Sequence, residues 1–177
     1  RAAKTLRICW LTSIRLFMPA RVNKFMTARP ATFDESFAHD WLAVILERPL
    51  QVFHGQRYIY PQAVRKLDAV EVGEVSLDSL QILLCARPEA TTDMATFALG
   101  FAESSLPHGV WSCPNPQQLC AVAGGYAYLV HPGQPGQCMQ IPYRPVASVH
   151  PAVEQNLLIF ASFYKLWALG PNGQVWE

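Results

Sequence analysis

The amino-acid sequence predicts a mostly β fold, built from repeated antiparallel meanders that pack face to face, with one N-terminal helix. Two segments, "LCAVAGGYAYLVHPGQPGQC" at 119–138 and "LLIFASFYKLWALGPNGQVW" at 157–176, repeat one order of features 38 positions apart. Each has an apolar run, a tyrosine, a second apolar run and a cluster of turn residues. Upstream runs alternate large and small or apolar and polar residues with the two-residue period of strands.

Length, composition and charge place the chain among single-domain globular proteins. The 177 residues are enough for a buried core, and 51% of them are hydrophobic against 15% charged. Residues 1–33 carry seven basic residues and no acidic one, whereas the other seven basic residues stand against all 13 acidic residues, a net charge of −6. We interpret residues 1–31 as a basic tail, disordered or outside the native coding sequence, with a targeting segment or a nucleic-acid arm as alternatives. Residues 32–177 form the β-rich domain.

Partners and compartment follow from what the sequence lacks. No apolar run reaches the length of a membrane span, and the acidic body lacks a basic face interleaved with aromatic residues, so neither a membrane nor a nucleic acid is predicted as a partner. No secretory signal precedes the cysteines, which predicts reduced thiols and a cytoplasmic protein. The cysteines are Cys9, Cys85, Cys113, Cys120 and Cys138.

The N-terminal helix is predicted over "TFDESFAHDWLAVILE", residues 32–47. Thr32 and Glu35 form a capping-box pattern, and Arg48-Pro49 would end the helix. A second short helix is predicted at 61–68, with Pro61 in its first position. The apolar stripe of the first helix, at a spacing of four, is Phe33, Phe37, Trp41 and Ile45.

Strand patterns follow from residue 50 onward. We expect a hairpin in "LQVFHGQRYIY" at 50–60, a half-exposed strand in "VEVGEVSL" at 70–77 and a strand buried on both faces in "LQILLCA" at 80–86. "MATFALGF" at 94–101 alternates large and small side chains and is a further strand. "ESSLPHGVWSCPNPQQ" at 103–118 is polar and rich in proline, and we expect it to be a loop.

The two repeated segments predict two meanders of about three strands each. The first has strands at 119–123 and 126–130 joined by Gly124-Gly125, and the second has strands at 157–161 and 164–169 joined by Ser162-Phe163. One more strand is expected near 146–149. The 38-residue spacing is close to the ~40-residue blade of a β-propeller, but two copies cannot close a ring. We therefore predict a propeller-like fragment, truncated at the C-terminus, or an open sandwich.

The stretches "LPHGVWSCPNPQQLCAVAGGYAYLV" and "LLIFASFYKLWALGPNGQVWE" resemble an uncharacterised family of bacterial all-β proteins in which a "LLLF…AWGxxGxxW" phrase is followed by further strands. The resemblance covers residues 94–177, and its motifs are hydrophobic strands and glycine turns. It implies more strands after Glu177, and it brings no catalytic or binding residue with it.

Catalytic, metal and cofactor motifs are weak in this sequence. Six cysteines and histidines lack the close ligand pairs of zinc sites, so no metal and no cofactor is predicted. "AGGYAY" lacks the lysine and helix of a phosphate loop. No catalytic residue is predicted; the alternative is a nucleophilic Cys113 assisted by His108. The six residues are His108, Cys113, Cys120, His131, Cys138 and His150.

The candidate binding residues are Tyr143, Arg144 and Trp111, because aromatic and arginine side chains anchor partner contacts when they are exposed. Prolines fix the backbone on both sides of Tyr143 and Arg144 in "IPYRPV". The alternative is that Tyr143 closes the core and Arg144 caps carbonyl groups at strand ends. We expect a non-catalytic β-rich scaffold that binds a protein or a small ligand; the alternative is a small cytoplasmic enzyme using Cys113 and His108.

Overall fold

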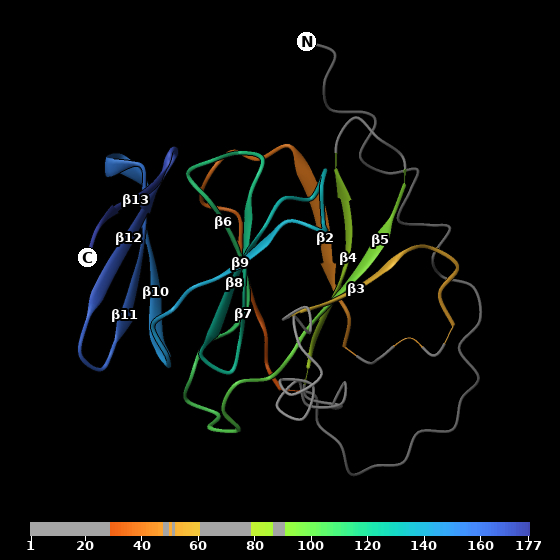
Figure 1. Cartoon of the computed structure of the whole chain (residues 1–177), viewed down its shortest axis with the longest axis horizontal. Coiled ribbons are helices and arrows are strands. Elements are labelled where there is room, and N and C mark those ends of the chain that lie inside the picture. Colours follow the sequence, from red (N-terminus) through yellow and green to blue (C-terminus); the bar gives the residue numbers. More distant parts are fainter. Residues whose placement is uncertain (1–28, 48–49, 51, 61–78, 87–90) are drawn as a thin grey trace.

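A computed structural model describes residues 29–47, 50, 52–60, 79–86 and 91–177, and these residues are mostly β (Figure 1). They form thirteen strands in three sheets, which confirms the predicted β character. The basic segment 1–28, the short helix predicted at 61–68 and the strand predicted at 70–77 lie outside the described residues. Arg29 is described, and its guanidinium donates hydrogen bonds to the carbonyl oxygens of Phe101 and Leu106.

The central sheet has the strand order β1-β6-β7-β8-β9. Strands β6 to β9 run antiparallel in sequence, and β1 adds to β6 in parallel. Gly124 and Gly125 have φ values of 56° and 78° and close the β7–β8 hairpin as predicted, because a two-residue turn of this kind needs positive φ at both positions. The strands are β1 (Thr32–Asp34), β6 (His108–Ser112), β7 (Leu119–Ala123), β8 (Tyr126–Val130) and β9 (Cys138–Gln140).

The C-terminal sheet is an antiparallel meander in which β10, β11, β12 and β13 follow one another in space as in sequence. A 3₁₀ turn at Val153–Gln155 joins β10 to β11. The strand predicted near 146–149 is the start of β10. The strands are β10 (Val146–Ala152), β11 (Leu157–Ser162), β12 (Leu166–Gly170) and β13 (Gly173–Trp176).

The N-terminal sheet has the order β2-β4-β5-β3. The two inner strands are antiparallel, while β3 pairs with β5 in parallel. Leu80, Ile82 and Leu84 of β4 are buried and Leu83 is half-buried, so the strand predicted to be buried on both faces has one closed face and one partly open face. The strands are β2 (Trp41–Ile45), β3 (Arg57–Tyr60), β4 (Leu80–Ala86) and β5 (Asp93–Phe97).

The three sheets form three layers, with the central sheet in the middle (Figure 1). Alternate residues of β7 point to opposite sides, as the two-residue strand period requires. Leu119 and Ala121 join the core shared with the N-terminal sheet, whereas Cys120 and Val122 join the core shared with the C-terminal sheet. Both faces of the central sheet are therefore closed to water at these positions.

The predicted N-terminal helix is wrong, because residues 32–47 contain β1 and β2. A spacing of four is a multiple of two as well as close to 3.6, so Trp41 and Ile45 share one face in a strand as they would in a helix. Leu42, which would widen a helical stripe, is 49% exposed. The Asp34 carboxylate also accepts hydrogen bonds from the backbone N–H and the hydroxyl of Ser36, a local turn that competes with helix formation.

Two further expectations are corrected. The segment 103–118 is not only a loop, because it contains β6, which pairs with both β1 and β7. The hairpin expected at 50–60 does not form in the described residues: the second run is β3, but it pairs with β5. Within the described ranges, the structure contains no helix with the length and hydropathy needed to cross a membrane.

Candidate ligand-binding site

A hollow of about 430 Å³ opens between the β1–β2 connection and the loop that joins β8 to β9. It lies where the N-terminal and central sheets meet, since Trp41 and Ala86 come from β2 and β4 while the other side is formed by segments that flank β7 and β8. The described residues that line it are Asp40, Trp41, Ala86, Gln117, His131, Pro132, Gly133, Gln134 and Gln137.

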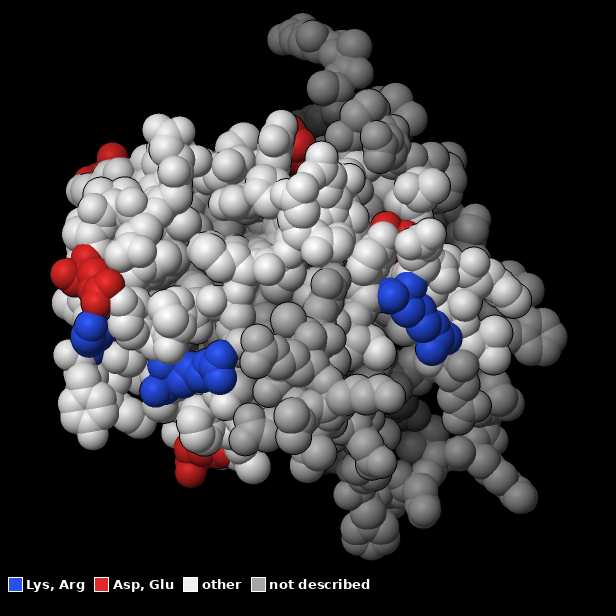
Figure 2. All heavy atoms as spheres, in the orientation of Figure 1, with Lys and Arg blue, Asp and Glu red and all other residues white. Residues whose placement is uncertain are grey.

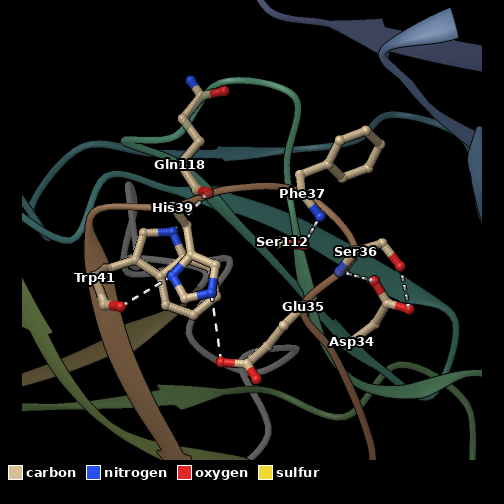
Figure 3. A network of polar contacts seen from close by, with 8 residues as sticks. All are labelled: Asp34, Glu35, Ser36, Phe37, His39, Trp41, Ser112 and Gln118. Atoms are coloured by element: carbon tan, nitrogen blue, oxygen red, sulfur yellow. Dashed lines mark hydrogen bonds and ion pairs between the residues drawn. The ribbon is translucent and has the colours of Figure 1, made fainter. Parts of the chain in front are cut away.

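The β1–β2 connection is fixed by short polar contacts (Figure 3). After the Asp34–Ser36 turn, the backbone N–H of Phe37 donates to the Ser112 hydroxyl of β6 at 2.9 Å. The backbone N–H of Asp40 donates to the carbonyl oxygen of Pro116 at 3.0 Å. These contacts attach the connection to the central sheet at both of its ends.

Trp41 is held in place by two partners, His39 and Gln118, at the edge of the hollow (Figure 3). The His39 ring stacks on the indole, with 4.0 Å between ring centroids and 21° between ring planes. His39 Nδ1 donates to the Trp41 carbonyl oxygen at 3.0 Å, and its Nε2 lies 3.4 Å from Glu35 Oε1. The indole N–H donates to the carbonyl oxygen of Gln118 at 3.0 Å. Both nitrogens of His39 are thus engaged, so this imidazole serves to position Trp41.

The opposite wall is the loop 131–137, "HPGQPGQ", which is held by hydrogen bonds within the loop and by one from the N-terminal sheet. The N–H of Gln134 donates to the His131 carbonyl oxygen at 2.9 Å, and the N–H of Gln137 donates to the Gln134 carbonyl oxygen at 2.8 Å. The Tyr60 hydroxyl of β3 donates to the carbonyl oxygen of Pro135. The loop is therefore attached to the N-terminal sheet as well as to its own strands.

His131 links this loop to the other side of the hollow. Its Nε2 lies 2.8 Å from Gln118 Nε2. With the amide N–H donating, His131 Nε2 is the acceptor and the ring proton sits on Nδ1. The backbone carbonyl of the same Gln118 receives the Trp41 indole N–H, so one residue connects both walls.

Four polar side chains at the hollow are exposed and available to a ligand. The carboxylate of Asp40 and the amides of Gln117, Gln134 and Gln137 have no hydrogen bond or ion pair with any residue in the described part of the chain. The described lining contains no lysine or arginine. Fixed walls with unpaired hydrogen-bonding groups at the mouth can bind a small polar molecule.

The structure places the three predicted binding residues in different environments. Trp111 is only 6% exposed and lies in the core between the central and C-terminal sheets, so it is not a surface anchor. Tyr143 is half-buried against the same core. Arg144 is exposed, and its guanidinium stacks 4.6 Å from the centroid of the Tyr126 ring and donates to Gln140 Oε1.

Tyr143 belongs to a surface cluster with Lys165 and Glu177. Lys165 Nζ pairs with the Glu177 carboxylate and lies 4.9 Å from the centroid of the Tyr143 ring. Hydrogen bonds from Lys165 and from the Tyr143 hydroxyl lower the pKa of Glu177, and the same carboxylate raises the pKa of both donors. These contacts join the β9–β10 loop, the β11–β12 loop and the residue after β13.

The Cys113 and His108 pair of the enzyme alternative is not brought together. His108 begins β6 and Cys113 follows its end, so at ~3.3 Å per residue their Cα atoms are about 16 Å apart. Cys113 is fully buried, and burial raises the pKa of its thiol far above the ordinary range. Burial also raises the pKa of Cys120 and brings that of Cys138 to about 12. In the described residues, no three His, Cys, Asp or Glu side chains are placed to hold a metal ion.

Charged side chains do not gather into a patch of one sign on the face shown in Figure 2, where described Lys, Arg, Asp and Glu residues stand singly or in small groups among uncharged ones. The described part of that face therefore has no concentration of one sign of charge.

Sequence reasoning missed the hollow itself. Its lining comes from four segments spread between residues 40 and 137, and its polar residues are ordinary loop residues when taken singly. The signal that was present is "HPGQPGQ", where each of the two glutamines follows a Pro-Gly step, but the sequence indicated only a turn there. The chain matches no protein family, no curated protein and no solved structure at a significant level.

Proposed function

We propose that this protein is a non-catalytic β-rich binding module that holds a small polar ligand in the hollow between its N-terminal and central sheets. One observation carries the proposal: both walls are fixed by hydrogen bonds, yet Asp40, Gln134 and Gln137 keep unpaired polar groups at the mouth among the described residues. A site whose walls are already ordered loses little entropy when a ligand enters.

The net free energies of the available hydrogen bonds set the affinity to expect. A hydrogen bond contributes about 0.5–1.5 kcal/mol net. Four such bonds, to Asp40, Gln117, Gln134 and Gln137, supply about 4 kcal/mol, which corresponds to a Kd of about 1 mM. Trp41 and Pro132 are already buried and leave little apolar surface for a ligand to cover, so a dissociation constant in the millimolar range is expected.

The rim at Tyr143 and Arg144 is the weaker candidate surface, because these side chains already engage Lys165, Glu177, Tyr126 and Gln140 within the molecule. The burial of Cys113 and its separation from His108 weigh against the enzyme alternative. A cytoplasmic location and membership of the bacterial all-β family remain predictions from the sequence.

We also infer a propeller-like relation between the three sheets. The face of the C-terminal sheet turned away from the central sheet carries apolar side chains that a further sheet of the same kind would cover, as the central sheet covers Leu158 and Phe160. These outward residues are Leu157, Ile159 and Leu166.

The binding proposal is tested by filling the hollow. Gly133 lines it, and among the described residues a Cβ there would meet only Ala86 Cβ at 3.8 Å, so Gly133→Trp places a bulky ring in or over the space. The matched control is Gly136→Trp, in the same loop but outside the described lining, where a Cβ meets no atom of the described residues within 4 Å. Binding of a panel of small polar compounds is followed by saturation-transfer NMR and thermal shift.

We expect at least one compound to bind the wild type and the Gly136→Trp protein, and to bind the Gly133→Trp protein at least about 10-fold more weakly. The proposal is abandoned if no compound binds, or if the compound binds both variants equally.

A further inference from the structure

The polar groups of the hollow share one property: most of them both donate and accept hydrogen bonds. A primary amide offers two N–H donors and a carbonyl acceptor, and three such groups line the space, from Gln117, Gln134 and Gln137. His131 adds an Nδ1–H donor, since its Nε2 accepts from Gln118. The Asp40 carboxylate adds two acceptor oxygens.

Charge contributes little to selection at this site. The described lining has a single charged side chain, Asp40, and no lysine or arginine to hold an anion. Asp40 is exposed, so water and salt screen its attraction for a cation. Selectivity therefore comes from hydrogen-bonding capacity.

Shape and polarity exclude an apolar ligand. Trp41 is 1% exposed, so it offers no open aromatic platform. Pro132 is also buried, and an apolar molecule would cover the amides of the loop 131–137 without pairing them, which costs free energy. The volume of about 430 Å³ is within the range of small-molecule sites.

We propose that the hollow binds an uncharged polyhydroxylated compound, of the monosaccharide or disaccharide class, through the amides of Gln117, Gln134 and Gln137 and the carboxylate of Asp40. A hydroxyl group also donates and accepts at once, and vicinal hydroxyls can donate to both oxygens of one carboxylate. This inference rests on the proposed function, because it names the ligand class of the same site.

The test uses named probes on the whole chain. Uncharged probes are glucose, galactose, mannose, N-acetylglucosamine, maltose and cellobiose; charged probes are choline, spermidine, citrate and inorganic phosphate. Binding is measured by saturation-transfer NMR and by titration at two salt concentrations. We expect an uncharged sugar to bind with little dependence on salt, and the charged probes to bind at least about 10-fold more weakly.

Single variants locate the contacts. Gln134→Ala and Gln137→Ala are each expected to weaken sugar binding about 2- to 10-fold, the equivalent of one lost hydrogen bond. Gln155→Ala, an exposed glutamine in the 3₁₀ turn of the C-terminal sheet, is the control and should leave binding unchanged.

The outcomes separate this inference from the proposed function. If a sugar binds and Gly133→Trp blocks it while Gly136→Trp does not, both stand. If only a charged probe binds and Gly133→Trp blocks it, the binding site stands and the sugar class is wrong. If no probe binds, or if Gly133→Trp has no effect, both are wrong.

Discussion

Gly109 lies in β6 directly beside the backbone of Thr32 in β1. A Cβ at this position would lie 2.1 Å from the Thr32 carbonyl oxygen, far inside contact distance. The close approach of β1 to the central sheet therefore depends on a residue without a side chain, in a segment whose proline and glycine content hid the strand from sequence reasoning.

Gly109→Ala is expected to lower the free energy of unfolding by about 2 kcal/mol or more, because β1 must move away from β6. Urea denaturation provides the measurement. Gly136→Ala is the control, since a Cβ there meets no described atom within 4 Å, and it should change stability by less than about 0.5 kcal/mol. Equal stabilities for the two variants would show that β1 does not pair as described.

The buried thiols are expected to be unreactive. Burial raises the pKa of Cys113, Cys120 and Cys138, the last to about 12, so the reactive thiolate is scarce at neutral pH and grows only as pH rises toward those values. Iodoacetamide at pH 7.5 should alkylate Cys113 and Cys120 at least about 100-fold more slowly in the native protein than in urea. Peptide mass spectrometry gives the rates. Rapid native labelling of Cys113 would revive the enzyme alternative.

Among the elements, β13 is attached to its neighbours by the contacts of Glu177 with Lys165 and Tyr143. The pKa of Glu177 is lower in the folded protein than its usual value of 4.5. The stabilisation of this end of the sheet is therefore present above the unfolded-state pKa and is lost as pH falls through the lower folded-state value.

Lys165→Met should raise the pKa of Glu177 toward 4.5, since it removes the hydrogen bond that lowers this pKa most, and Tyr143→Phe should raise it by a smaller amount. An NMR titration of the Glu177 side chain measures both. If neither variant changes the titration, the cluster does not form in solution.

The meander strands could be predicted because β-rich runs and turn residues there agree with each other. The runs at 119–123 and 126–130 are separated only by Gly124-Gly125, a pair that favours a tight two-residue turn because glycine adopts positive φ readily. The helix predicted at 32–47 was wrong because a four-residue spacing fits a helix and a strand equally. Pairing of β2 with β4 favours the strand. The strand β6 was not predicted, because its strand character depends on pairing with β1 and β7, which no local pattern shows.

At the scale of the whole molecule, three layers give the central sheet a special position. Cys120, Val122, Ala127 and Leu129 face one core, and Leu119 with its alternating neighbours faces the other. Opening β7 or β8 would expose both cores, whereas opening an edge strand such as β13 exposes little.

Amide hydrogen exchange should therefore be slowest in β7 and β8 and fastest, among the described strands, in β13 and β3, which are at sheet edges. Mass spectrometry or NMR under native conditions gives the order. Faster exchange in β8 than in β13 would contradict the layered arrangement.

The hollow is also a property of the whole molecule. It exists only once the N-terminal sheet and the loop 131–137 are packed together, with Tyr60 donating to Pro135 and Trp41 to Gln118. Residues 77 positions apart contribute to one wall contact, so the sequence could suggest single loop residues but not their meeting.

The closed central sheet has a consequence for which substitutions the protein tolerates. In a strand of an outer layer, every second residue faces water and can be replaced by a polar residue. Along 119–123 and 127–130 each position is buried, so a saturation-mutagenesis scan should show an unbroken intolerant block there and an alternating pattern in β2, whose exposure itself alternates.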